Sequence, residues 1–220
     1  MSGFVGKEGL KIRFGRPRDP KSFHSEANLL TYARLVLCLT FFILALVEKR
    51  ELYNYIGIVI HWVADVADGY VARKLKQETI YGAEIDIISD RIETTFFCVN
   101  FMFFHPALFI PIAVFLLDFA FVDFYLTNQF TKFSLISPNH FYKVDRTVFA
   151  LNFGRTGKAV NSVAVVALLA FFPSLWVVAT ALAAGLIGVK IYSIWRLYRK
   201  RESPVPLETE DMEEERLSCV

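Results

Sequence analysis

The feature that most constrains this chain is the clustering of its apolar residues into six long runs. The runs cover residues 29–47, 52–71, 85–104, 107–126, 160–172 and 175–195. A helix needs about 20 residues to cross the hydrocarbon core of a bilayer, and the fifth run approaches that length if its helix begins at Gly157. A soluble domain of this size has no core that would bury all six runs. The sequence therefore predicts an all-α integral membrane protein with six transmembrane helices.

Lysine and arginine residues mark one side of the predicted membrane. They gather before the first run, between the second and third, between the fourth and fifth, and after the sixth, whereas the alternate connections hold only Lys49 and Arg50. Basic loops stay on the cytoplasmic side, so we expect both termini to be cytoplasmic. The pattern fits a bacterial plasma membrane and the endoplasmic reticulum equally well.

The two ends of the chain differ from the membrane domain, which we place at residues 28–199. Residues 1–27 are basic with scattered apolar side chains, and they either lie in the lipid interface or form a solvated arm. Residues 200–220 are rich in acidic side chains, and we expect them to form a disordered tail.

Composition excludes several other classes of protein. With 55% hydrophobic residues the chain is too apolar to be disordered. Its formal net charge of +2 is small for a nucleic-acid binder, so we expect no nucleic-acid partner. Three cysteines are too few for a disulfide scaffold.

Acidic residues interrupt the second and third runs. An ionisable side chain inside a span costs about 2.5–3.5 kcal/mol on insertion scales and therefore indicates a functional site. Residues three or four apart share one face of a helix, which places Asp65 and Asp68 on one stripe and Asp86, Asp90 and Glu93 on another. Because the connecting loop is short, we expect the two helices to be antiparallel neighbours whose acidic stripes face each other near the cytoplasmic surface.

Carboxylates placed this close together repel one another unless protons or cations lie between them. Oxygen ligands without histidine or cysteine favour Mg²⁺, Mn²⁺ or Ca²⁺ over zinc. Gly69, Ala72 and Gly82 share the acidic stripes, where small residues either allow close helix packing or admit a large ligand. Their position beside the carboxylates favours a ligand site.

The acidic segment also resembles a known signature. Residues 65–90 read D-x2-D-G-x2-A-R-x8-G-x3-D-x3-D. This pattern is similar to the signature of the CDP-alcohol phosphotransferase family at all of its fixed positions and gaps. Residues 28–34 read N-L-L-T-x-x-R and resemble the family's usual first-helix start, which is a weaker signal.

The resemblance implies an enzyme that transfers a substituted phosphate from a CDP-linked donor, here CDP-diacylglycerol, to an alcohol and releases CMP. It also implies a six-helix membrane protein, typically a homodimer, with two divalent cations (Mg²⁺ or Mn²⁺) and an active site open to the cytoplasm. By position, the metal ligands would be Asp65, Asp68, Asp86 and Asp90, with Asp90 also the general base. The residues implied to border the nucleotide or the rest of the donor are Asn28, Thr31, Gly69, Ala72, Arg73 and Gly82.

The acceptor alcohol is indicated less directly. Residues 86–91 read D-I-I-S-D-R, which resembles the D-M-x-T-D-R form of phosphatidylinositol synthases, whereas members that use glycerol phosphate more often read D-P-x-x-D-K. Leu117-Asp118 resembles the start of the inositol enzymes' L-D-x-x-S-H element, but Phe121 and Val122 replace its Ser-His pair. We therefore expect inositol or a phosphorylated polyol as acceptor, with glycerol 3-phosphate as the alternative.

Further polar residues are candidates for binding the acceptor. Asp118 and Asp123 in the fourth run would hold its hydroxyl groups, or would instead form hydrogen bonds between packed helices. Arg146, Arg155 and Lys158 would bind a phosphate on the acceptor, or would serve only as positive charge on the cytoplasmic side.

Two other classes of membrane protein compete with the enzyme. A cation or proton transporter also uses buried acids, but we would expect repeats or broken helices near the bilayer midplane, whereas these acids lie at the cytoplasmic ends of two spans. A membrane scaffold leaves the acids unexplained. The predicted function is therefore metal-dependent transfer of a phosphatidyl group from CDP-diacylglycerol to a small alcohol in phospholipid synthesis.

Overall fold

The computed structural model describes residues 26–75 and 78–202. Within these ranges the chain consists of helices joined by short loops and contains no strand, which confirms the all-α prediction. The expected interfacial segment at residues 1–27 and the expected acidic tail at 200–220 lie almost entirely outside the described residues.

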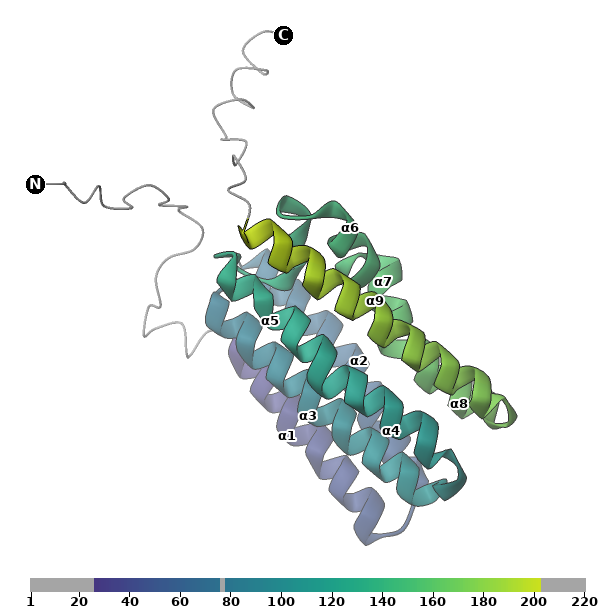
Figure 1. Ribbon diagram of the computed structural model, residues 1–220. Coiled ribbons are helices and arrows are strands. Elements are labelled where there is room, and N and C mark those ends of the chain that lie inside the picture. The colour runs from purple at the N-terminus through teal and green to yellow at the C-terminus, as the bar shows by residue number, and fades with distance from the viewer. Residues whose placement is uncertain (1–25, 76–77, 203–220) are drawn as a thin grey trace, which may run out of the picture.

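The first three predicted spans form one group of closely packed helices (Figure 1). Its members are α1 (Glu26–Val47), α2 (Glu51–Lys74) and α3 (Ile80–Phe104). The helices α1 and α2 approach closely at Gly57, where an added Cβ atom would lie 2.5 Å from Cε1 of Phe42. Helix α3 begins after Thr79, whose side chain accepts a hydrogen bond from the backbone N–H of Gly82 and so satisfies one free donor of the first turn.

The remaining helices, except the last one, are built from shorter pieces. The fourth predicted span comprises η2 (Pro106–Leu108), α4 (Phe109–Leu117), η3 (Asp118–Asp123) and α5 (Phe124–Lys132). The connection to the fifth contains η4 (Pro138–Lys143), α6 (Arg146–Val148) and η5 (Phe149–Phe153). The last two predicted spans comprise α7 (Arg155–Ala159), η6 (Val160–Ala164) and α8 (Val165–Phe171), then η7 (Pro173–Leu175) and α9 (Trp176–Glu202). Three pieces, η3, η5 and η6, are π-helical, and such turns are frequent at functional sites.

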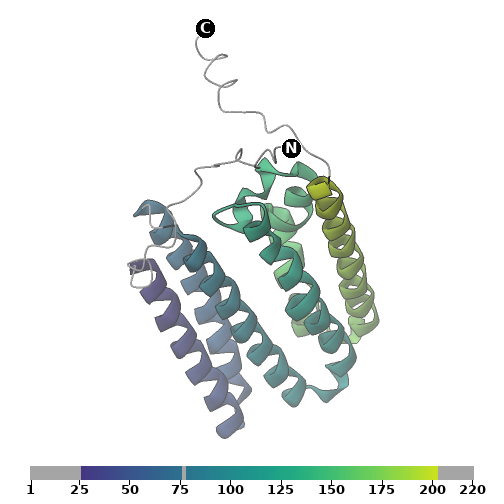
Figure 2. The ribbon, with the colours of Figure 1, turned by 60° about the vertical axis from the view of Figure 1, so that its left-hand side comes forward.

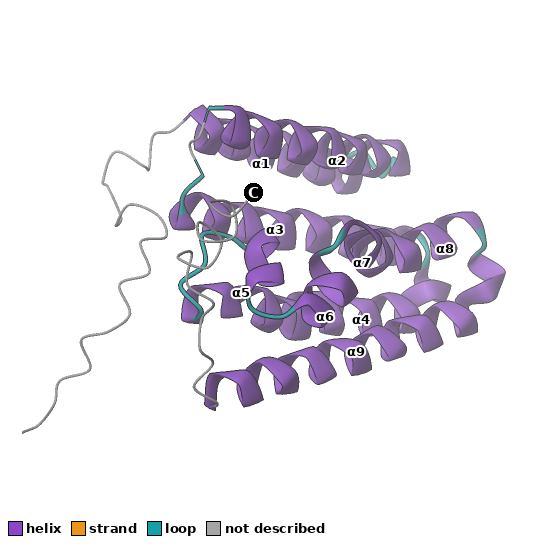
Figure 3. Cartoon of the chain, turned by 90° about the horizontal axis from the view of Figure 1, so that it is seen from above, coloured by secondary structure: helices purple, strands orange, loops and turns teal. Residues whose placement is uncertain are grey.

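The helices form a bundle in which α1 and α2 lie on one side and α9 lies on the opposite side (Figure 3). The start of α1 and the end of α9 lie at the same end of the bundle (Figure 2).

Two apolar clusters hold the helices together. One joins α1, α3, α4, α8 and α9 through residues such as Phe42, Phe97, Phe115 and Leu169. The other joins α3, α5, η4, η5 and α9 through residues such as Ile87, Phe130, Phe141 and Leu197.

The surface of the bundle suits a membrane. Large apolar side chains point outward, among them Val36, Val63 and Val177, each more than half exposed, and a soluble protein rarely exposes so much apolar surface. By length and composition, the described helices able to cross a membrane are the segments Asn28–Val47, Pro106–Lys132 and Pro173–Lys200. These three segments indicate a membrane protein. The acids and other polar residues of α2 and α3 lower the hydropathy of those helices.

Candidate functional site

The two predicted acidic stripes meet around one arginine of α1. The Nη1 atom of Arg34 lies 2.9 Å from Oδ1 of Asp65 and 3.0 Å from Oδ2 of Asp68, both on α2. Its Nη2 atom lies 3.2 Å from Oδ1 of Asp86 and 2.8 Å from Oδ1 of Asp90, both on α3. The Arg34 side chain is fully buried. Arg34 therefore joins the three helices and holds one oxygen of each motif aspartate.

Two further residues extend this cluster into the bundle. Oε2 of Glu93 lies 3.4 Å from Nε of Arg34 and is in hydrogen-bond contact with Nδ1 of His61. The residues Arg34, Glu93 and His61 are all buried. The motif comparison assigned no site role to Arg34 or His61. A signal for Arg34 was present, because it is the only charged residue in the first apolar run, and a charge in a span normally has a partner.

The charges and donor atoms of the cluster fit divalent cations. Five carboxylates surround one guanidinium. When all five are ionised and His61 is neutral, this leaves an excess of four negative charges, the charge that two divalent cations balance. Asp65, Asp68 and Asp86 each offer an oxygen, and these oxygens lie within 4.8 Å of one another. Carboxylate oxygens are the ligands that Mg²⁺ and Mn²⁺ favour. Asp90 belongs to a second such group, with His61 and Glu93.

The smaller of two cavities beside the acids gathers the residues implied to bind the donor. It is lined by Asn28, Thr31, Asp68, Gly69, Ala72, Gly82 and Asp86, among others. Thr31 donates a hydrogen bond to Oδ2 of Asp68 at 3.2 Å. An added Cβ atom at Gly82 would lie 2.8 Å from Oδ1 of Asn28, so the Asn28 side chain would have to shift to admit a larger residue. The side chain of Arg73 lies outside what the structure describes.

The larger cavity has a volume of about 510 Å³ and lies between the acids and the second half of the chain. Asp65, Asp86 and Asp90 line it, with side-chain exposures of 43%, 40% and 32%. Of the predicted acceptor residues, Asp123 and Lys158 also line this cavity. The other three are placed elsewhere: Asp118 is fully buried, and Arg146 and Arg155 are exposed away from the cavity lining.

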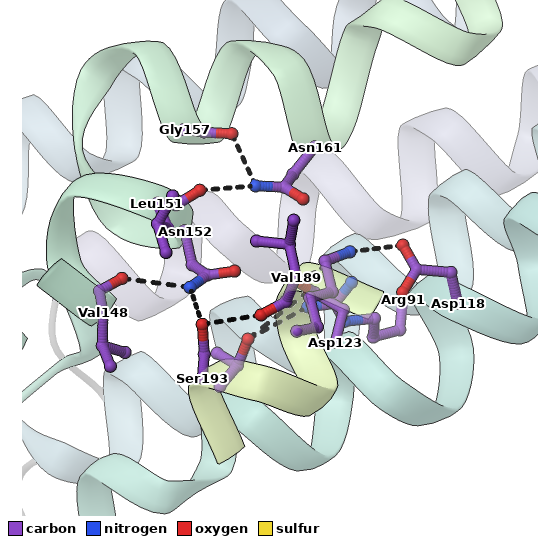
Figure 4. A network of polar contacts seen from close by, with 12 residues as sticks. Arg91, Asp118, Asp123, Val148, Leu151, Asn152, Gly157, Asn161, Val189 and Ser193 are labelled. Carbon is purple, nitrogen blue, oxygen red and sulfur yellow. Dashed lines mark hydrogen bonds and ion pairs between the residues drawn. The ribbon is translucent and has the colours of Figure 1, made fainter. Parts of the chain in front are cut away.

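Asp118 and Asp123 belong to a separate charged network (Figure 4). Asp118 is bonded to Lys190 of α9, and Asp123 is bonded to Arg91 of α3 and lies 3.1 Å from Nζ of Lys190. Two acids thus meet two basic residues, and the network is electrically balanced. For Asp118 this arrangement favours the helix-packing alternative over direct contact with an acceptor.

Comparison with known proteins identifies the family to which the chain belongs. Residues 25–191 match the family model described as CDP-alcohol phosphatidyltransferase. The chain belongs to the CDP-alcohol phosphatidyltransferase family. The match includes the acidic motif and the helices that carry it, and it confirms the resemblance predicted from residues 65–90.

One curated relative adds detail to the family match. It is a CDP-diacylglycerol–glycerol-3-phosphate 3-phosphatidyltransferase of Aquifex aeolicus (strain VF5), 33% identical over 92 residues. The similar region covers 41% of this chain and 50% of the relative, so the chain spans about half the length of the relative it matches. No solved structure matches the chain.

Proposed function

We propose that this protein transfers a phosphatidyl group from CDP-diacylglycerol to a small alcohol and releases CMP, as a step of phospholipid synthesis. The observation that carries the proposal is the convergence of the family's motif acids on one side-chain cluster. Asp65, Asp68, Asp86 and Asp90 all contact Arg34, and three of them line a cavity of about 510 Å³. Cavities of this size hold small ligands.

The proposed reaction joins an acceptor hydroxyl oxygen to the phosphorus atom that carries diacylglycerol. The bond between this phosphorus and the CMP oxygen breaks, and CMP leaves with the bonding electron pair. Asp90 accepts the proton of the attacking hydroxyl. This role follows the family motif and is supported by the position of Asp90, which lines the larger cavity next to the polar side chains of Arg91 and Thr94.

We assign the divalent cations, Mg²⁺ or Mn²⁺, to the acid cluster. Asp65, Asp68 and Asp86 would supply one set of oxygen ligands, and Asp90 would contribute a further ligand. When bound, the cations would neutralise the donor diphosphate and the charge that develops on the leaving CMP. Without them, the excess negative charge of the cluster would repel the donor.

The nucleotide part of the donor is assigned to the smaller cavity. Gly69, Ala72 and Gly82 line it and leave space beside Asp68 and Asp86. Asn28 and Thr31 line the same cavity from α1, where their polar groups would face the ligand. The two cavities have Gly69 and Asp86 in common, so donor and acceptor would meet at the acids.

Six membrane-spanning segments are the topology that we propose for residues 28–199, with both termini cytoplasmic, in a bacterial plasma membrane or the endoplasmic reticulum. The positions of the start of α1 and the end of α9 at one end of the bundle support an even number of crossings (Figure 2). A homodimer is the proposed assembly, since the family resemblance implies one.

Glycerol 3-phosphate is the acceptor that the comparisons favour. The Aquifex relative is named for that alcohol, and Lys158, which lines the larger cavity, offers a positive charge for its phosphate. Inositol or its phosphate is the second candidate, because residues 86–91 resemble the inositol enzymes. Arg146 and Arg155 are exposed and would act on the approach of a phosphorylated acceptor.

A direct assay tests the function and the acceptor together. The purified full chain in detergent would be given CDP-diacylglycerol, Mn²⁺ or Mg²⁺, and in parallel glycerol 3-phosphate, inositol, inositol phosphate or serine. We expect release of CMP with glycerol 3-phosphate, with inositol or its phosphate, or with both. We expect turnover to be lost in EDTA. Absence of CMP release with all four acceptors would refute the proposed activity.

A further inference from the structure

Three residues that line the larger cavity carry buried polar atoms that no described residue satisfies. These atoms are Nε and Nη1 of Arg91, Oδ1 of Asn152 and Oδ1 of Asn161. Buried polar atoms are nearly always paired, and leaving one unpaired costs about 1–3 kcal/mol. Three residues with such atoms around one cavity indicate groups that pair with a bound ligand.

Arg91 is held in place on two sides. Its Nη2 atom donates hydrogen bonds to Asp123 and, at 3.4 Å, to Thr127. The guanidinium group also lies over the ring of Phe119, with Cζ 3.9 Å from the ring centroid. Because these contacts fix the guanidinium plane, the directions of the unpaired N–H groups are fixed before any ligand binds.

The two asparagines are also fixed through their amide nitrogens (Figure 4). Nδ2 of Asn152 donates to the carbonyl of Val148 at 3.0 Å and to Oγ of Ser193 at 2.8 Å. Nδ2 of Asn161 donates to the carbonyls of Gly157 at 2.7 Å and Leu151 at 3.2 Å. Because these bonds fix each amide group, its oxygen is already oriented as a hydrogen-bond acceptor before a ligand binds. Both residues lie in π-helical segments, η5 and η6.

The electrical balance around these atoms suits hydroxyl groups better than a phosphate. The charge of Arg91 is compensated within its network by Asp123, and that of Lys190 by Asp118. This part of the cavity lining has no net charge and offers both hydrogen-bond donors and acceptors. It is therefore suited to bind a hydroxyl group, which donates one hydrogen bond and accepts others. Lys158 is different, because its Nζ atom is bonded to the neutral Oδ1 of Asn139 at 2.7 Å and its charge is left for an anion.

We propose that Arg91, Asn152 and Asn161 determine acceptor specificity by binding hydroxyl groups of a polyol other than the hydroxyl that reacts. Arg91 donates to such a hydroxyl, and the two amide oxygens accept from it or from a neighbouring one. The acceptor class is therefore an alcohol with at least two hydroxyl groups. The inference rests on the proposed function, since it concerns the acceptor of the same reaction.

The inference can be tested by a two-by-two comparison, in which the wild type and one variant are each assayed with the acceptor and with one acceptor analogue. Arg91→Lys keeps the charge facing Asp123 but removes the Nε and Nη1 donors. The wild type and this variant would each be assayed with glycerol 3-phosphate and with 1,3-propanediol monophosphate, which lacks the non-reacting hydroxyl. If inositol supports turnover instead, inositol and a monodeoxyinositol take their places.

We expect each single change to raise the acceptor KM by roughly 3- to 10-fold, the effect of one hydrogen bond. The combination should raise it no further, because the variant and the analogue remove the same contact. The KM for CDP-diacylglycerol should not change. Effects that multiply, or an unchanged acceptor KM in the variant, would overturn the inference while leaving the proposed function standing. If the wild type releases no CMP with any acceptor, both fail.

Asn152→Ala extends the test, and Asn100→Ala is its matched control. Asn100 is also buried, its Nδ2 atom donates to Phe42 O and Asn54 Oδ1, and its Oδ1 atom is also unpaired among the described residues, but it does not line the larger cavity. Both variants should lose similar thermal stability, and only Asn152→Ala should raise the acceptor KM. Equal KM values in the two variants would contradict the role of Asn152. If Asn152→Ala does not fold, the Arg91→Lys comparison decides alone.

Discussion

Two basic residues, Arg34 and Lys190, lie in similar sequence surroundings but in different structural ones. Each is the only charged residue of its apolar run, one in the first and one in the last, and each is fully buried. Arg34 lies among five carboxylates. Lys190 lies beside Asp118 and Asp123, and the second of these also pairs with Arg91.

The difference separates a cluster that needs cations to balance its charge from one that does not. The Lys190 network contains equal numbers of acids and bases, so its charges are balanced within the protein, and it can serve to join α3, η3 and α9. The Arg34 cluster keeps an excess of negative charge beside a cavity, and buried charge without compensation is costly. Charge balance therefore distinguishes the structural network from the candidate active site, although both consist of the same residue types.

The largest expected effect comes from removing the proposed base in the unbalanced cluster. Asp90→Asn should reduce CMP release by about 10²- to 10⁴-fold, since that is the usual contribution of general base catalysis. The thermal unfolding temperature should stay the same or rise, because one of several mutually repelling carboxylates is removed. Near-normal turnover of the folded variant would show that Asp90 is not the base.

Breaking the balanced network should instead affect stability. Lys190→Met leaves Asp118 buried without its partner, which we expect to destabilise the protein by about 3–5 kcal/mol. Thermal unfolding in detergent, followed by circular dichroism, measures the loss. The double variant Lys190→Met with Asp118→Leu should recover part of it, because both members of the pair are then gone. A single variant as stable as the wild type would contradict the structural role of the network.

Divalent cations should distinguish the two clusters directly. At a Mn²⁺ concentration about 100 times its Kd, one occupied site stabilises the folded state by about 2.7 kcal/mol. We expect the unfolding temperature to rise correspondingly for the wild type and for Lys190→Met. The rise should be smaller for Asp86→Asn. If Mn²⁺ had no effect on the wild type, the assignment of cations to the acid cluster would be wrong.

A third ion cluster is centred on Asp145, which lies between the predicted membrane spans; it extends the comparison and has the smallest expected effect. Asp145 caps α6 by accepting from the backbone N–H groups of Thr147 and Val148, and its Oδ2 atom lies 2.7 Å from Arg196 and 3.1 Å from Lys200. Burial raises the pKa of Asp145, but the hydrogen bonds from Arg196, Val148 and Lys200 outweigh it and lower the pKa from the ordinary 3.8 to about 2.

This lowered pKa fixes the sign of a pH effect. The ionised Asp145 stabilises the folded state above pH 3.8, and its contribution is lost as the pH falls through about 2. Asp145→Asn should therefore destabilise the protein by about 1–2 kcal/mol at neutral pH. The difference in unfolding temperature between wild type and variant should shrink between pH 4 and pH 2. A difference that is constant with pH would rule out the charge of Asp145 as its source.

Much of the candidate site could be predicted from local sequence. The spacing of Asp65 and Asp68, and of Asp86 and Asp90, places each pair on one helix face, and the short connection between α2 and α3 brings the two faces together. The structure shows both pairs on a single guanidinium. The sequence also indicated the small residues that line the smaller cavity, since they share the faces of the acids.

Other parts of the site could not be predicted in this way. Asn152 and Asn161 carried no sequence signal, because their orientation depends on π-helical turns that shift the usual helical spacing. His61 was assigned no role, and its contact with Glu93 joins residues on two different helices. Asp118 was predicted either to bind the acceptor or to form a hydrogen bond between packed helices, and the structure places it against Lys190.

The sequence by itself determined the helical class, the motif acids and the family of this protein, because helix periodicity and motif spacing are properties of neighbouring residues. Only the tertiary structure determined which charged side chains pair with one another. Arg34 lies 31 residues from Asp65 and 56 from Asp90, and Lys190 lies 72 from Asp118. Such pairs are set by how helices pack against one another, and that packing decides that Arg34 joins an unbalanced cluster while Lys190 joins a balanced one.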